Sequence, residues 1–443
     1  MRRRIALLSS CVKPDIPINY TNYLTIEPLE ADLTVTLSDS DCYYSIDGGD
    51  WILLSRGNST PIINTGTLLR FKRDDSISSL GTFSVSKKFN LRGNCMSMLY
   101  GDNAVEYDYV EEYSFKELFK NSKVVSIEQN FLPATKLASY CYYSMFYGCT
   151  SLINVPTLPA TILNSYCYYS MFRGCTSLVN APTILPATTL NSHCYDSMFY
   201  GCKSLVNAPE LPATELESYC YYSMFNNCSN LVNAPELPAT VLESYCYYSM
   251  FNNCSNLVNA PELPATKLAN QCYRSMFSRC TSLVNAPNLP ATALASYCYY
   301  SMFSNCTSLV NAPTELPAIT LNSYCCYSMF SGCTNLINVP TILPATTLSS
   351  NCYYSMFQNC SSLTVAPELP ATKLAYYCYN YMFSGCSKLN YIKAKFTTEP
   401  STSYTDRWVY NVSSGGTFIK NKDATWNITG INGIPEGWTV ITE

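Results

Sequence analysis

The sequence predicts an α/β repeat solenoid, and two regularities support this. The phrase Leu-Pro-Ala-Thr-x-Leu recurs at steps of 26 or 27 residues, and the extra residue always falls just before it, as expected of a loop. Each unit repeats the same apolar positions, which one coil can bury only by stacking against its neighbours. The phrase, with one variant at Leu316, begins at Leu132, Leu158, Leu185, Leu211, Leu237, Leu263, Leu289, Leu316, Leu343 and Leu369.

Each coil is predicted to contain one short parallel strand and one short helix. The stretch 178–182 is apolar and ends at a proline, which cannot donate to a strand ladder. Between residues 165 and 175, Cys167, Met171 and Phe172 have spacings that suit one face of a helix. Ten such coils follow one another in the chain.

The flanking segments differ from the repeat and predict five regions. Short alternating runs such as 33–37 and 51–54, separated by turn residues at 47–49, indicate a small antiparallel β module. The last segment contains the turn-forming stretches 413–416 and 433–435. The predicted regions are an N-terminal arm at 1–13, a β-sandwich-like module at 14–97, a linker and degraded capping repeat at 98–131, a ten-coil solenoid at 132–396 and a C-terminal β cap at 397–443.

The composition excludes several classes of function. Charged residues are only 13% of the chain, and the net charge of −4 gives no basic face for nucleic acid. No apolar run is long enough for a membrane span. The 38 tyrosines, which combine an apolar body with a polar tip, supply much of the expected surface.

The N-terminus allows two interpretations. Residues 1–11 read MRRRIALLSSC and resemble a lipoprotein leader that would place lipid on Cys11. The apolar stretch 5–8 is shorter than a leader requires, and a cleaved leader would not leave a chain that starts at Met1. We therefore favour a chain without a leader, with lipid on Cys11 as the alternative.

Cysteines and asparagines recur in register and are predicted to be structural. Each coil has two cysteines eight residues apart, such as Cys167 and Cys175, and lacks the close pairs of a zinc site. We expect a ladder of buried free thiols, which suits folding in a reducing compartment, and no metal. A ladder of stacked amides is expected to satisfy backbone groups. It comprises Asn154, Asn180, Asn207, Asn233, Asn259, Asn285, Asn311 and Asn338.

Tyrosines supply the candidate binding surface. The position two residues after the first cysteine accepts Asp196, Arg274 and Asn380, so we expect it to face solvent. Exposed rings in a row could stack on sugars or anchor a protein partner; alternatively, they only shield the coils. The predicted stripe comprises Tyr143, Tyr169, Tyr222, Tyr248, Tyr300, Tyr327 and Tyr354.

The sequence gives little support for catalysis. The single histidine, His193, takes the place of a repeated tyrosine and has no partner pattern for a nucleophilic site. Repeated carboxylates such as Glu210 and Glu236 favour solvated edge positions over calcium ligands. A paired-carboxylate glycosidase stays open as an alternative. We predict no enzyme activity, no catalytic residue and no cofactor.

The stretch Met145-Phe146-x-Gly148-Cys149-Thr150-Ser151-Leu152 resembles the BspA-like leucine-rich repeats of surface proteins of Bacteroidales and their phages. The segment 44–51 is similar to a β module that often precedes such arrays. The resemblance implies a solenoid of the leucine-rich-repeat type and a role in adhesion or ligand binding. The added Leu-Pro-Ala-Thr phrase and Cys-Tyr-Tyr triplet depart from the usual unit, so no ligand can be carried over.

These observations favour a non-enzymatic adhesive protein on the surface of a phage virion, as a fibre or decoration. Its expected partners are a host-surface glycan or protein and, through the N-terminal module, other virion proteins; a homo-oligomer is compatible with this hypothesis. Two alternatives stay open. One is a bacterial outer-surface lipoprotein adhesin anchored at Cys11, and the other is a structural spacer without a ligand.

Overall fold

The computed structural model describes residues 22–74 and 80–443. They belong to two compact units, which divide after Pro212. The predicted arm at 1–13, with Cys11, lies outside the described residues.

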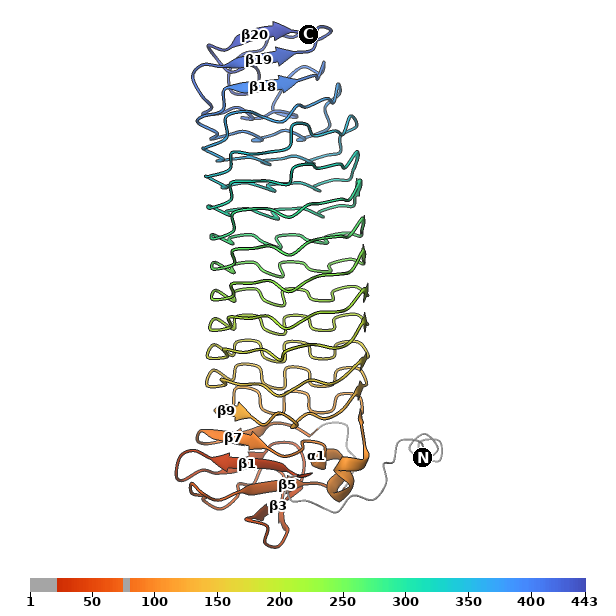
Figure 1. Cartoon of the computed structure of the whole chain (residues 1–443), viewed down its shortest axis with the longest axis vertical. Helices are drawn as coiled ribbons and strands as arrows, with labels where there is room; N and C mark the ends of the chain where they lie inside the picture. Colours follow the sequence, from red (N-terminus) through yellow and green to blue (C-terminus); the bar gives the residue numbers. More distant parts are fainter. Residues whose placement is uncertain (1–21, 75–79) are drawn as a thin grey trace. The chain divides into compact units, whose positions relative to one another are not determined.

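The N-terminal module is built on antiparallel strands, which confirms that part of the prediction (Figure 1). Its six-stranded sheet has the order β4-β3-β5-β1-β7-β9, and a separate pair joins β2 to β6. The bounds are β1 (Leu24–Pro28), β2 (Val35–Leu37), β3 (Cys42–Ile46), β4 (Ile52–Leu54), β5 (Leu69–Lys72), β6 (Phe83–Val85), β7 (Phe89–Arg92) and β9 (Val124–Ile127). Strands β1 and β7 were not foreseen, although β1 pairs with both β5 and β7 in the middle of the sheet.

Strand β9 links this module to the first coils of the same unit. It comes from the degraded repeat at 98–131 and pairs with β7 in parallel. Phe83 of the module stacks on Phe119 of that repeat, with ring centroids 5.3 Å apart. The module therefore covers strand edges and apolar surface that the first coil would otherwise expose. The connection contains α1 (Ser97–Tyr100) and the 3-10 helix η3 (Gly101–Glu106).

The coils of the first unit touch at two sets of parallel contacts. One set lies in the Leu-Pro-Ala-Thr-x-Leu phrase, where the final leucine is buried. The other lies in the predicted strand, where Asn180 forms a parallel bridge with Asn207. Strand β10 pairs with β8 on one side and β11 on the other. The bounds are β8 (Tyr109–Val110), β10 (Lys136–Leu137), β11 (Ile162–Leu163) and β12 (Thr189–Leu190).

The second unit is also built of coils and ends in a parallel sheet. In its final sheet β18, β19 and β20 pair in parallel (Figure 1). The buried Trp408 ring packs edge-on against Phe418 of β19, with centroids 6.2 Å apart. The strands of the predicted C-terminal cap thus pair in parallel, as the strands of the coils do. The bounds are β13 (Glu215–Leu216), β14 (Val241–Leu242), β15 (Lys267–Leu268), β16 (Ala293–Leu294), β17 (Thr320–Leu321), β18 (Tyr391–Ala394), β19 (Thr417–Lys420) and β20 (Thr439–Thr442).

The repeat solenoid is confirmed, but the short helix expected in each coil is replaced by a ribbon of turns. Between residues 107 and 443, all of which are described, no helix forms. Every second residue adopts a left-handed conformation instead, with φ values of 63°, 60° and 51° at Tyr166, Tyr168 and Ser170. Backbone N–H groups then alternate: Met171 donates to Tyr168 in its own coil, whereas Phe172 donates to Met198 of the next.

Coil spacing explains why the ribbon replaces the helix. Packed helices lie about 8–10 Å apart, whereas neighbouring strands lie about 4.8 Å apart. Stacked phenylalanines in adjacent coils, such as Phe146 and Phe172, have centroids 5.7 Å apart. A helix is too wide for that spacing, and it would use its N–H groups within one coil. The ribbon accepts left-handed residues and links the coils by hydrogen bonds.

Buried thiols form hydrogen-bonded ladders along the coils. The cysteines among the described residues are free and buried, as the spacing predicted. The second cysteine of a coil donates to a phenylalanine carbonyl of the preceding coil, as from Cys280 Sγ to Phe251 O at 3.1 Å. The first makes a similar contact, as from Cys272 Sγ to Glu243 O at 3.1 Å. Burial raises the pKa of Cys306 to about 12, so its thiol keeps the proton it donates.

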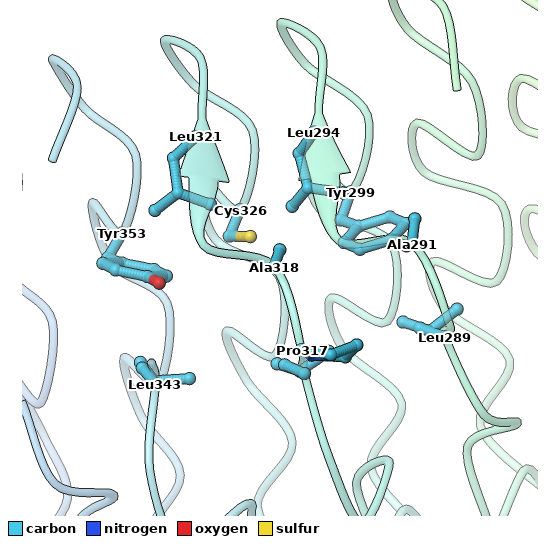
Figure 2. A pocket seen from close by; sticks show the side chains of 11 residues that line it. Leu289, Ala291, Leu294, Tyr299, Pro317, Ala318, Leu321, Cys326, Leu343 and Tyr353 are labelled. Atoms are coloured by element: carbon cyan, nitrogen blue, oxygen red, sulfur yellow. The ribbon is translucent and has the colours of Figure 1, made fainter. Parts of the chain in front are cut away.

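A column of buried tyrosines runs beside the first cysteines and has one gap. At Cys326 a second cysteine replaces the ring, and a void of about 10 Å³ lies between Tyr299 and Tyr353 (Figure 2). The neighbouring rings are spread: Tyr273 and Tyr299 are 6.4 Å apart, compared with 5.8 Å for Tyr247 and Tyr273. The void is lined by apolar groups and is too small for a ligand.

Filling this gap should stabilise the protein. We expect Cys326→Tyr to raise the free energy of unfolding by about 1–2 kcal/mol, because the ring would restore the column. The opposite kind of change in the neighbouring coil, Tyr299→Cys, should lower the free energy of unfolding by about 3 kcal/mol because it enlarges the cavity. Chemical denaturation of both variants measures the difference. A less stable Cys326→Tyr protein would show that the neighbouring rings cannot return to the regular spacing.

Candidate binding surface

Two outer columns of aromatic side chains run along the coils, and we call them together the tyrosine surface. The first outer column is formed by the residue just before the first cysteine of each coil. The second outer column is the predicted stripe. In the first unit the columns contain Tyr140, Tyr166 and His193 beside Tyr143 and Tyr169. In the second unit they contain Tyr219, Tyr245, Tyr297, Tyr324 and Tyr377 beside Tyr222, Tyr248, Tyr300, Tyr327 and Tyr354.

Rings within a column stack nearly parallel. Centroids of Tyr143 and Tyr169 are 4.6 Å apart with 5° between the planes. In the second unit, Tyr327 lies 4.7 Å from Tyr300 and 4.6 Å from Tyr354. The coil spacing sets this geometry, because each coil presents the same side chain at the same place. All predicted stripe residues are half-buried.

This stacking changes how a ligand would meet the surface. The spacing predicted ring faces that could stack on a sugar, but a neighbouring ring already covers each face inside a column. Ring edges and the tips of the side chains remain available. Within the columns the surface is therefore suited to edge contacts and hydrogen bonds. Only a gap or an end of a column can offer an aromatic face.

The first outer column was not predicted from the sequence. Its signal was present: the position before the first cysteine is usually tyrosine but accepts His193, Gln271 and Asn351. The two columns contact each other with tilted rings, as between Tyr245 and Tyr248 at 6.2 Å. The stripe is thus half of a wider aromatic surface.

The three substitutions that suggested exposure behave differently from one another. Arg274 stays within the aromatic surface, with its guanidinium carbon 4.4 Å from the Tyr300 centroid and a 3.0 Å hydrogen bond to Gln271. Asp196 and Asn380 are buried instead. Tolerance of polar residues at this position therefore reflects local hydrogen bonding as well as solvent exposure.

His193 and Asp196 form a local pair without the arrangement of a catalytic triad. His193 Nδ1 lies 3.0 Å from Asp196 Oδ2, and the Ser197 hydroxyl donates to the other carboxylate oxygen. Burial raises the pKa of Asp196, while the His193 contact acts in the opposite direction. The Ser197 hydroxyl thus donates to the acid, whereas the hydroxyl of a nucleophile activated by a base donates to the imidazole. In the described part of the chain, no group of three or more His, Cys, Asp or Glu side chains could hold a metal ion.

The asparagine ladder lies on the surface. Asn154, Asn180, Asn207, Asn233, Asn259, Asn285 and Asn338 are exposed, and Asn311 is half-buried. In the second unit their backbones form successive parallel bridges from Asn233 to Asn338. Asn311 and Asn338 each donate a side-chain hydrogen bond to the asparagine of the preceding coil, at 2.5 Å. Val365 takes the asparagine position in a later coil and forms a parallel bridge with Tyr391.

The stacked coils define the chain as a repeat protein whose side chains form columns. Comparison with protein families identifies the repeat: the model for the BspA type leucine-rich repeat region, six copies long, matches residues 104–231, 172–310, 221–364 and 296–405. These matches span more than half of the chain, so it belongs to this family. The family indicates a surface-binding, adhesin-like repeat protein, and its members generally act as non-enzymatic scaffolds.

No curated protein and no solved structure matched the chain. Among the described residues, no helix combines the length and apolar character needed to cross a membrane.

Proposed function

We propose that this chain is a non-enzymatic adhesive protein that binds a host-surface glycan or protein through the tyrosine surface. The observation that carries this proposal is the pair of outer aromatic columns, each held in register by the coils. Stacked rings are already immobilised, so binding orders few side chains. Tyrosine also combines contact area with a hydrogen-bonding tip, which favours its use in recognition surfaces.

Tyr143 and Tyr327 of this surface carry uncharged hydrogen-bonding groups at neutral pH. Partial burial and nearby phenols raise the pKa of Tyr143 and of Tyr327 to about 12. A neutral phenol can both donate and accept a hydrogen bond. The surface therefore suits a partner rich in hydroxyl or amide groups.

The conservative change from tyrosine to phenylalanine tests the surface without removing the stacks. We expect the combined variant Tyr222→Phe, Tyr248→Phe, Tyr300→Phe to bind host cells at least about tenfold more weakly, because each lost hydrogen bond costs about 1 kcal/mol. Binding of labelled full-length protein to host cells and to a glycan array measures this. Tyr247→Phe combined with Tyr273→Phe is the matched control, because those two rings are buried. Equal binding by both variants would refute a role for the outer hydroxyls, and no binding by the parent would favour a spacer.

We further propose that the protein is displayed on a phage virion, as a fibre or decoration attached through the N-terminal module. The ladders of free thiols support this, because they suit folding in a reducing cytoplasm. The alternative is a bacterial lipoprotein anchored at Cys11. Mass spectrometry of purified phage particles and of the bacterial membrane fraction separates the two: lipid on Cys11 would overturn the virion proposal.

A further inference from the structure

An open groove of about 520 Å³ lies in the second unit, where the tyrosine surface meets the coils before β19. Its walls contain rings from both outer columns, and its polar groups come from two asparagines and the loop at 402–406. The lining residues used below are Tyr324, Tyr354, Tyr377, Asn351, Asn380 and Asp406.

The groove lies at one of the two coils that lack a ring in the first outer column; at the other, Gln271, the Arg274 guanidinium lies 5.3 Å from the Tyr297 centroid. In the first outer column, Tyr297 and Tyr324 stack 4.8 Å apart with 4° between their planes. The next coil has Asn351 at this position, and the next ring, Tyr377, is two coils beyond Tyr324. Two coil steps correspond to about 9–10 Å. No ring of the first outer column therefore stands between Tyr324 and Tyr377, and the neighbour that holds the Tyr377 ring is Tyr376, whose ring centroid lies 3.8 Å away and whose hydroxyl donates to the Tyr377 hydroxyl at 2.7 Å.

The second column also loses its regular stacking at this place. Tyr354 is stacked on Tyr327, but Tyr381 meets it with a tilt of 44° at 5.6 Å. The stripe position of that coil is Asn380, which is buried. Its amide donates to Thr402 O at 3.2 Å and accepts from Asp406 N at 2.9 Å. Asn380 thus fixes the loop that forms the polar wall.

Polar groups face the groove between these rings. Asn351 is 8% exposed and lines the groove in the coil that lacks the ring. Asp406 is half-buried, and among the described residues its carboxylate forms no ion pair. Aromatic faces, an amide and a carboxylate are the groups that suit a flat ring with an apolar face and a rim of hydroxyls.

We propose that this groove binds one pyranose ring of a glycan, held between the Tyr324 and Tyr377 rings. Asn351 and Asp406 bind its hydroxyls, and the chain beyond that sugar continues toward Tyr354. This inference rests on the proposed adhesive function and names both the ligand class and the place. An aromatic ring can stack on a sugar at this gap, because the ring faces inside the columns are covered by neighbouring rings.

The test fills the gap with the ring that other coils carry. In full-length Asn351→Tyr protein, the new ring should complete the column and weaken binding to arrayed mucin glycans at least tenfold. Asp406→Asn should weaken it about threefold to tenfold, because it removes the charge from one hydrogen-bonding group. The matched control is Gln271→Tyr, which adds a ring to the same column in a coil outside the groove. Gln271 there donates to the Tyr245 hydroxyl at 2.7 Å.

Titration with the methyl glycosides of galactose and N-acetylglucosamine reports direct sugar binding. Loss of array binding in Asn351→Tyr, with binding retained in Gln271→Tyr, supports the groove. Equal glycan binding by the parent and Asn351→Tyr overturns the groove but leaves the adhesive function intact. A parent that adheres to cells and binds no arrayed glycan or glycoside overturns the glycan assignment alone. A parent that binds neither overturns both proposals.

Discussion

Above about pH 9 the protein is expected to unfold cooperatively, because its buried thiols and phenols must lose their protons. Burial raises the pKa of Cys167, Cys298 and Cys386 from 9.0 to about 12. A raised pKa means that the folded state binds the proton more tightly than the unfolded state does. The stabilisation is therefore complete below pH 9 and is lost as the pH rises toward 12.

The expected effect is large because many groups titrate together. Each such thiol contributes a loss of about 1.4 kcal/mol per pH unit between its unfolded and folded pKa. A handful of thiols is enough to cancel a typical stability of about 5–15 kcal/mol within one or two pH units. Buried tyrosines such as Tyr168 and Tyr379, whose pKa values are also raised, add to the loss above pH 10.

Circular dichroism and tyrosinate absorbance, followed from pH 7 to pH 12 under reducing conditions, measure this transition. Both signals should change together in a narrow range, and the fold should return when the pH is lowered promptly. Gradual ionisation of the 38 tyrosines around pH 10 with unchanged circular dichroism would contradict the prediction. A free-tyrosine solution provides the reference titration curve.

Removing one ring from the buried phenylalanine column should have the second largest effect. Phe251 is fully buried and stacks between Phe225 and Phe277, with centroids 5.7 Å and 5.6 Å away. We expect Phe251→Ala to lower the free energy of unfolding by about 3–5 kcal/mol, through lost burial and the cavity it leaves. The loss affects both neighbouring coils, because each coil is stabilised by its contacts with the next.

Val258→Ala is the control for Phe251→Ala, since Val258 belongs to the same coil and is 42% exposed. It should change the free energy of unfolding by less than about 0.5 kcal/mol. Urea denaturation of the parent and both variants gives the comparison. Similar stability of the parent and Phe251→Ala would mean that the coils relax enough to close the cavity.

The candidate site could be predicted only in part from the sequence. The stripe from Tyr143 to Tyr354 was visible as a repeated position, and so was the thiol ladder. The stacking that covers the ring faces was not, because it depends on the distance between coils. The groove at Asn351 was also invisible: its substitution is apparent in the repeat, but the loop at 402–406 that completes the wall lies outside it.

By itself, the sequence determined that this protein is a repeat solenoid, because a period of 26 or 27 residues with fixed apolar positions can be buried only by stacking. It also determined which residues form columns, since equivalent positions must align. Only the tertiary structure decided the backbone of each coil. The spacing of Cys167, Met171 and Phe172 fits a helix and the observed ribbon equally well, and the close approach of neighbouring coils admits only the ribbon.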